Sequence, residues 1–209
     1  MKKRWLPLLV ALAMLLGLLS GCASNSGDAD GGNSESGGTS SSTDDVLYHV
    51  FHSIPYTTLD PSIEYSNGIL VLQNVYETLT HYNAETGEVD PMLATEWSSN
   101  EDGTVWTFKL REDVTFHDGT PMTSAEVKGS LERTITCSSP APIDLIASAG
   151  YASYIMSAAS QEQDAEWFNA GNDGGTGPYR ITQATGDTVV LQAYDAYYGG
   201  WSDDQYKNV

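Results

Sequence analysis

The stretch W-S-S-N-E-D-G-T-V-W-T-F-K-L-R-E-D-V-T-F-H-D-G-T-P-M-T-S-A-E-V-K-G-S-L-E-R, residues 97–133, carries the most consistent local signals in the chain. It contains two short alternating runs, at residues 105–110 and 114–116. In the first run Trp106, Phe108 and Leu110 fall on one face, as a half-buried strand requires. Asp-Gly pairs at 102–103 and 118–119 predict turns.

A helix is predicted to begin directly after these runs. Thr123 and Glu126 have the T-x-x-E spacing of a capping box, which makes Thr123 the expected N-cap. Met122 and Val127 occupy the positions of a hydrophobic staple. The stretch therefore predicts a hairpin, a turn and a capped helix in succession.

The rest of the chain adds elements of both kinds. A strand is expected at residues 46–51, and helical spacing of apolar residues predicts a helix over 69–79, capped by Ser66 or Asn67. A turn is expected at 85–88, and residues 179–183 and 188–193 alternate as a hairpin around Gly186-Asp187. The fold class is mixed α/β (α+β).

Composition excludes some partners. The 209 residues carry a formal charge of -19, and loss of Lys2, Lys3 and Arg4 with a leader would make it -22. Nucleic acid and anionic lipid would repel so acidic a chain. Two cysteines are too few for a disulfide framework.

Residues 1–22 are typical of an export signal, with a basic start and an apolar run at residues 5–19 that is short for a membrane span. The end, L-S-G-C, resembles the bacterial lipobox, which implies cleavage and lipidation at Cys22. The alternative is a plain secretory signal with an incidental cysteine. Residues 23–45, rich in Ser, Gly and Asp, are expected to form a disordered tether before a folded part at 46–209.

No catalytic or metal site is predicted. His49 and His52 fall on opposite faces of the expected strand, so we expect no metal there. The glycines of residues 174–178 lack the spacing and lysine of a phosphate loop and are interpreted as a turn. Cys137 has no activating histidine pattern. We expect neither enzymatic activity nor a cofactor.

The chain resembles the N-terminal part of the family 5 extracellular solute-binding proteins, the oligopeptide, dipeptide and nickel receptors of ABC importers. The matching motifs are L-D-P at 59–61, V-Y-E-T-L at 75–79, E-T-G-E-V at 85–89, P-M-L-A-T-E-W at 91–97, D-G-T-V-W-T-F-K-L-R at 102–111, F-H-D-G-T-P at 116–121, S-L-E-R at 130–133, G-T-G-P-Y-R at 175–180 and Y-Y-G-G at 197–200.

The resemblance implies a periplasmic-binding-protein-like fold whose two lobes close over a solute, commonly a peptide, and then meet an ABC permease. It implies a lipid-anchored protein at the outer face of the cytoplasmic membrane, held through Cys22. The loop after L-D-P contacts ligand in that family. The candidates are therefore Glu64, which could meet an amine, Tyr65, which could stack on or cover a ligand, and Ser66 and Asn67. The alternative is that Ser66 and Asn67 cap the helix while Glu64 is solvated.

The sequence also departs from the family pattern. A strand usually found after S-L-E-R is missing, which predicts an internal deletion near 134–140. Full members are more than twice as long, so the second lobe is expected to be absent and one lobe alone should not close over ligand. Gly129 replaces a frequent aromatic residue, at a helix cost of about 1 kcal/mol. A non-transport surface lipoprotein, acting in adhesion or interaction, is the alternative function.

Overall fold

The computed structural model describes Leu47, residues 56–134 and residues 139–209. All of them belong to one compact unit, Ser42–Val209. The expected leader with Cys22, the tether and Cys137 lie outside the described residues, as do all residues of the strand expected at 46–51 except Leu47, His49 among them.

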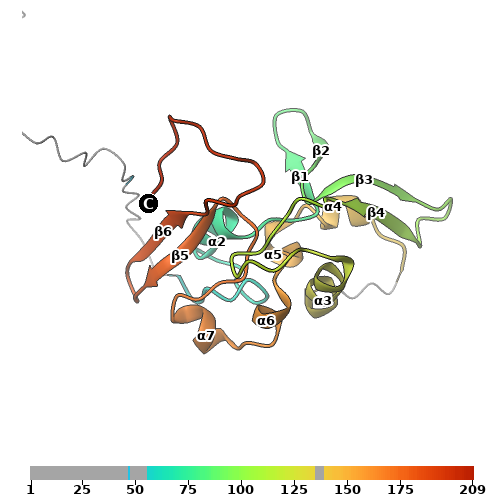
Figure 1. Cartoon of the computed structure of the whole chain (residues 1–209). Helices are drawn as coiled ribbons and strands as arrows, with labels where there is room; N and C mark the ends of the chain where they lie inside the picture. Colours follow the sequence, from blue (N-terminus) through green and yellow to red (C-terminus); the bar gives the residue numbers. More distant parts are fainter. Residues whose placement is uncertain (1–46, 48–55, 135–138) are drawn as a thin grey trace, which may run out of the picture. The chain divides into compact units, whose positions relative to one another are not determined.

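The described strands form three antiparallel hairpins, each a separate two-stranded sheet (Figure 1). They are β1 (Thr80–Asn83) with β2 (Glu88–Pro91), β3 (Ala94–Ser99) with β4 (Trp106–Leu110), and β5 (Tyr179–Ala184) with β6 (Val189–Ala193). The turns predicted at 85–88, 102–103 and 186–187 connect the strands of these three hairpins, and Gly87 and Gly103 have the positive φ angles that such turns need.

Short helices fill the space between the hairpins. They are α2 (Ile69–Val75), α3 (Ser124–Thr134), α4 (Ile143–Ile146), α5 (Gly150–Ser153), α6 (Ala158–Gln161) and α7 (Ala165–Asn169). The start of α3 confirms the predicted capping box. The Thr123 hydroxyl accepts from the Ala125 N–H at 3.1 Å, and the Glu126 carboxylate accepts from the Thr123 N–H at 2.9 Å. Met122 and Val127 are both buried in one cluster, as the staple requires.

Two expectations about secondary structure were wrong. Residues 114–116 form only an isolated bridge, Thr115 to Pro121, rather than a strand. The helix predicted over 69–79 ends at Val75, because Tyr76 turns to an extended conformation at φ -117° and ψ 148°. The carbonyl of Val75 accepts from the Gly177 N–H at 2.9 Å, and the Leu79 carbonyl accepts from Ala94 N–H at 2.8 Å. Contacts distant in sequence therefore replace the last helical turn.

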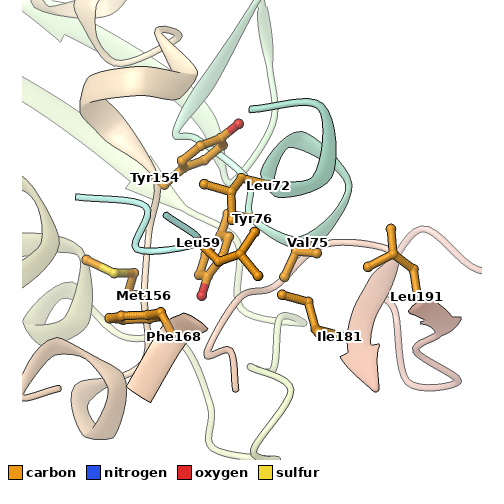
Figure 2. Packing of buried hydrophobic residues seen from close by; sticks show 9 residues of the cluster. All are labelled: Leu59, Leu72, Val75, Tyr76, Tyr154, Met156, Phe168, Ile181 and Leu191. Atoms are coloured by element: carbon orange, nitrogen blue, oxygen red, sulfur yellow. The ribbon is translucent and has the colours of Figure 1, made fainter. Parts of the chain in front are cut away.

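Two buried clusters make up the core. Figure 2 shows the first, which joins α2 to α7 and to the β5–β6 hairpin through Leu59, Leu72, Val75, Tyr76, Tyr154, Met156, Phe168, Ile181 and Leu191. The second lies around Phe116 and Leu79, beneath the start of α3. The extended residues 76–80 contribute to both clusters, with Tyr76 in the first and Leu79 in the second. This segment therefore connects the two halves of the core.

Gly129 lies on the face of α3 that meets α6. A Cβ atom at this position would overlap Oε1 of Gln161, whose amide nitrogen donates to the Glu126 carbonyl at 2.9 Å and to the Met156 carbonyl at 2.8 Å. Glycine therefore permits a close contact between the two helices that its low helix propensity alone would not suggest.

Candidate functional site

The loop of residues 58–68 begins with a tight turn at Asp60. The Asp60 carboxylate accepts from the Ser62 N–H at 2.9 Å and from the Ser62 hydroxyl at 2.6 Å, while its carbonyl accepts from the Glu64 N–H at 3.0 Å. Asp side chains favour such turns because they mimic a backbone acceptor. The L-D-P motif thus fixes the direction in which the loop leaves the core.

Glu64 points into the loop and is 2% exposed. One carboxylate oxygen accepts from the backbone N–H groups of Ser66 and Gly68, and the other accepts from the Thr58 N–H at 3.2 Å. Hydrogen bonds to a charged acceptor are stronger than neutral ones. The carboxylate therefore ties the two ends of the loop together, and its oxygens are already occupied.

Gly68 completes this arrangement. A Cβ atom there would lie 2.6 Å from the Thr58 carbonyl and 2.8 Å from the Glu64 side chain. Gly68 is also the N-cap of α2, and no side chain caps that helix. Both parts of the alternative interpretation were wrong: Ser66 and Asn67 do not cap α2, and Glu64 is buried rather than solvated.

The outward-facing side of the loop is apolar and aromatic. Tyr65 is 81% exposed and Ile63 is 53% exposed. Asn67 is exposed, and the hydroxyl of partly buried Ser66 lies 3.3 Å from that of Thr57. The structure therefore brings Tyr65, Ser66 and Asn67 to the surface and places Glu64 beneath them.

The loop is also fixed from the other side of the core. Asn169, the last residue of α7, uses one side-chain oxygen to accept from the Leu59 N–H at 2.7 Å and the Thr58 hydroxyl at 3.1 Å. The Asp164 side chain caps α7 by accepting from the Trp167 N–H at 3.1 Å. An exposed tyrosine on a loop held in this way is suited to contact a ligand without first having to order the backbone.

A second polar cluster was not predicted from the sequence. His117 Nδ1 lies 2.5 Å from an Asp173 oxygen, and its Nε2 lies 2.9 Å from the Gly177 carbonyl. A carbonyl only accepts, so Nε2 donates to Gly177, and the Asp173 carboxylate also accepts from the Ile181 N–H at 2.7 Å. With both ring nitrogens engaged, His117 is not available as a base.

Glu77 is the other unpredicted member. Its carboxylate is buried beside Thr176, Tyr197 and Tyr198, which all donate to it. It was missed because a helix was expected over 69–79, and the helical spacing of apolar residues assigns no buried role to Glu77. The signal that could have located it is an acidic residue inside an otherwise apolar V-Y-E-T-L run.

In residues 56–134 and 139–209, no group of three or more His, Cys, Asp or Glu side chains is arranged to hold a metal ion. None of the helices that the structure describes has the length and apolar character needed to span a bilayer.

Comparisons with known proteins show what this chain is similar to. Residues 88–142 match the family model for bacterial extracellular solute-binding proteins, family 5 Middle. A stretch of 63 residues is 44% identical to the nickel-binding periplasmic protein of Escherichia coli (strain K12), covering 30% of this chain and 12% of that protein. A 138-residue alignment is 30% identical to the dipeptide-binding protein DppE of Bacillus subtilis (strain 168), covering 64% of this chain and 24% of that protein.

Solved structures agree with the sequence matches. The crystal structure of the nickel ABC transporter from Bacillus halodurans has a TM-score of 0.61 at 27% identity, over 75% of this chain and 36% of that chain. Residues 88–142 are therefore similar to the family 5 extracellular solute-binding proteins, and the mixed α/β fold of the chain matches part of the larger periplasmic-binding-protein fold. Its matches span between 12% and 36% of the length of these three relatives.

Proposed function

We propose that this chain is part of a lipid-anchored solute-binding protein that captures peptides, or similar small solutes, for an ABC importer. The relatives support the transport class, because they are named as nickel-binding and dipeptide-binding proteins. The observation that carries the proposal is the rigid loop with Tyr65 at its surface. No bond is made or broken in this role.

The residues of the loop have separate roles in this proposal. Tyr65 covers or stacks on the ligand with a large aromatic surface that loses little conformational freedom on binding. Ser66 and Asn67 offer a hydroxyl and an amide to the ligand's peptide groups. Glu64 acts indirectly, because its carboxylate already accepts backbone N–H groups of the loop. An amine of the ligand is then held elsewhere in the binding protein.

The membrane link in this proposal is Cys22. Lipidation of this cysteine would place the protein at the outer face of the cytoplasmic membrane, where the permease receives its solute. Several acyl chains are needed for firm anchoring, since one chain alone binds a bilayer weakly. An intact-mass measurement of protein extracted from membranes is expected to show acyl groups on an N-terminal Cys22, and an unmodified cysteine would contradict the anchor.

Ligand class can be tested by recording amide shifts of the 209-residue chain in detergent during separate titrations. The ligands are a mixed di- to pentapeptide library, a nickel–histidine chelate and maltooligosaccharides. Peptides are expected to shift the amides of residues 62–68, and Tyr65→Ala is expected to abolish the shifts. Tyr82→Ala is the matched control, because Tyr82 is also an exposed tyrosine, at 47%, but lies in β1.

Other outcomes of the same titrations would change the assignment. Shifts with the nickel chelate or the sugars alone would replace peptide by that ligand class. A chain that responds to none of the three would favour the non-transport surface lipoprotein. An equal loss of signal in Tyr65→Ala and Tyr82→Ala would mean that the loop is not the contact.

A further inference from the structure

Glu77 is a carboxylate in the middle of the folded unit. It is 4% exposed and lies in the extended segment that connects the two core clusters. Its backbone carbonyl accepts from the Ile155 N–H at 2.9 Å, so the main chain around it is also fixed. The loop with Tyr65 does not use this carboxylate, and its role is separate from ligand contact.

Three hydroxyl groups from two distant segments donate to the Glu77 carboxylate. Thr176 donates to one oxygen at 2.9 Å, and Tyr197 and Tyr198 donate to the other at 3.0 and 2.8 Å. Both tyrosines belong to residues 194–201, called here the 194–201 segment. Burial raises the pKa of Tyr197 to about 12 and also raises the pKa of Tyr198, so both remain neutral donors at neutral pH.

No cation neutralises Glu77 through an ion pair among the described residues. Arg111 lies nearby, with its guanidinium 4.3 Å from the centroid of the Tyr198 ring, but it binds Asp113 through two hydrogen bonds of 2.9 and 2.7 Å. His117 is bound to Asp173. A buried charge that only neutral donors satisfy is costly.

The balance of these effects raises the pKa of Glu77 in the closed structure. Burial raises the pKa of Glu77 above its ordinary value of 4.5, although the hydrogen bonds from Tyr198, Thr176 and Tyr197 and the charge of His117 lower it. A protonated Glu77 keeps its place in the network, since a tyrosine oxygen can accept as well as donate.

The 194–201 segment is also held to the rest of the fold near its two ends, through Tyr194 and Trp201, and Tyr198 packs against the second core cluster. The Tyr194 N–H donates to the Pro178 carbonyl at 2.8 Å, and the Tyr194 hydroxyl donates to the Phe116 carbonyl at 2.8 Å. The indole N–H of Trp201 returns to the Tyr194 carbonyl at 3.0 Å, within the segment itself. The side-chain hydrogen bonds of Tyr197 and Tyr198 to Glu77 therefore tie the middle of the segment to the fold, together with the packing of Tyr198.

We propose that Glu77 is a proton-controlled latch, which holds the 194–201 segment against the fold more tightly when it is protonated than when it is ionised. When the segment opens, water reaches Glu77 and its pKa returns toward 4.5. Because the closed form has the higher pKa, protonation must favour closure by thermodynamic linkage. The latch is fully tight below pH 4.5 and loosens as pH rises through the pKa of the closed form.

Amide hydrogen exchange of the 209-residue chain in detergent, measured between pH 4.5 and 8, tests this latch. After correction for intrinsic exchange rates, the opening constant of the amides of residues 194–201 is expected to rise with pH. The rise is about tenfold for each unit by which closure raises the pKa of Glu77. Amides of the β3–β4 hairpin serve as the internal reference.

Variants assign the effect to Glu77. Glu77→Gln imitates the neutral acid, so its 194–201 segment is expected to stay protected and lose the pH dependence. Glu132→Gln is the matched control, because Glu132 is exposed and pairs with Lys128 on α3, and it is expected to exchange as the parent does. Tyr198→Phe removes one donor and is expected to move the transition to higher pH, which keeps the test valid if Glu77→Gln folds poorly.

Three outcomes would overturn the latch. Protection of the segment that falls with acid would mean that the ionised carboxylate is the tighter form. A pH dependence that persists unchanged in Glu77→Gln would assign the effect to the other charged groups that face this region, which are His117, Asp173, Arg111 and Asp113. An unchanged transition in Tyr198→Phe would exclude the hydroxyl network.

Discussion

Replacing Glu64 by glutamine should destabilise the fold although the side chain keeps its shape. The carboxylate accepts from Ser66 and Gly68 with one oxygen and from Thr58 with the other. Glutamine keeps one acceptor oxygen but presents an NH₂ group to the third donor. The Thr58 N–H is buried and would lose its acceptor, which costs about 1–3 kcal/mol, and the two remaining bonds would lose their charge assistance. We expect the free energy of unfolding to fall by about 3 kcal/mol.

Urea unfolding followed by circular dichroism measures this change by linear extrapolation. Glu101→Gln is the matched control, since Glu101 is exposed in the β3–β4 turn and should stay within about 0.5 kcal/mol of the parent. If Glu64→Gln were as stable as Glu101→Gln, the carboxylate would not be what holds the loop. Glu64 would then return as a candidate for direct contact with a ligand amine.

Three further predictions concern two glycines in close contacts and the affinity of this chain for peptides. Gly129→Ala is expected to lower stability by about 1–2 kcal/mol because the new Cβ atom overlaps Gln161. In a Gln161→Ala background the same change should raise stability by about 1 kcal/mol, since alanine favours a helix more than glycine does. A gain in both backgrounds, measured by thermal unfolding, would refute the contact. Gly175→Ala would overlap the Val75 carbonyl and is expected to lower the free energy of unfolding by about 3 kcal/mol or prevent folding. Gly186→Ala meets open space, so its free energy of unfolding in urea should equal that of the parent. Equal stability of the two variants would contradict the packing. Calorimetry with the di- to pentapeptide library is expected to give dissociation constants weaker than about 1 μM for this chain, and tighter binding would show that these 209 residues suffice for capture.

The region of residues 97–133 was predictable because its signals are local. A turn needs its Asp-Gly pair, and a capping box needs only Thr123 and Glu126 at the right spacing. The β3–β4 hairpin and the start of α3 therefore appear in the structure as expected. The bridge at Thr115 is the exception, since the run at 114–116 is too short for local pattern to decide whether a strand forms.

The end of α2 could not be predicted because distant residues decide it. Helical spacing continues through Leu79, but the Val75 carbonyl is bound by Gly177, about a hundred positions later in the chain. The glycines at 175 and 177 have no side chain and can approach that carbonyl closely. Tertiary pairing therefore overrode local propensity.

The candidate loop was located from the family resemblance, but the roles of its side chains needed the structure. From the sequence, Glu64 could meet a ligand amine or be solvated. Neither interpretation included a buried carboxylate that accepts hydrogen bonds from its own loop. Glu77 was missed for a similar reason, because burial of an acidic side chain depends on Tyr197 and Tyr198 arriving from a distant segment. Both cases involve acidic residues, which are seldom fully buried without partners.

In the proposed function, a peptide-like solute contacts the loop around Tyr65. Photo-crosslinking tests it most directly, with short peptides that carry a benzophenone group and mass spectrometry to locate the linked residues. Crosslinks are expected to concentrate in residues 62–68 of the 209-residue chain, to be competed by unlabelled peptide and to be strongly reduced in Tyr65→Ala. Crosslinks scattered over the surface, or concentrated on another element such as the β3–β4 hairpin, would contradict it.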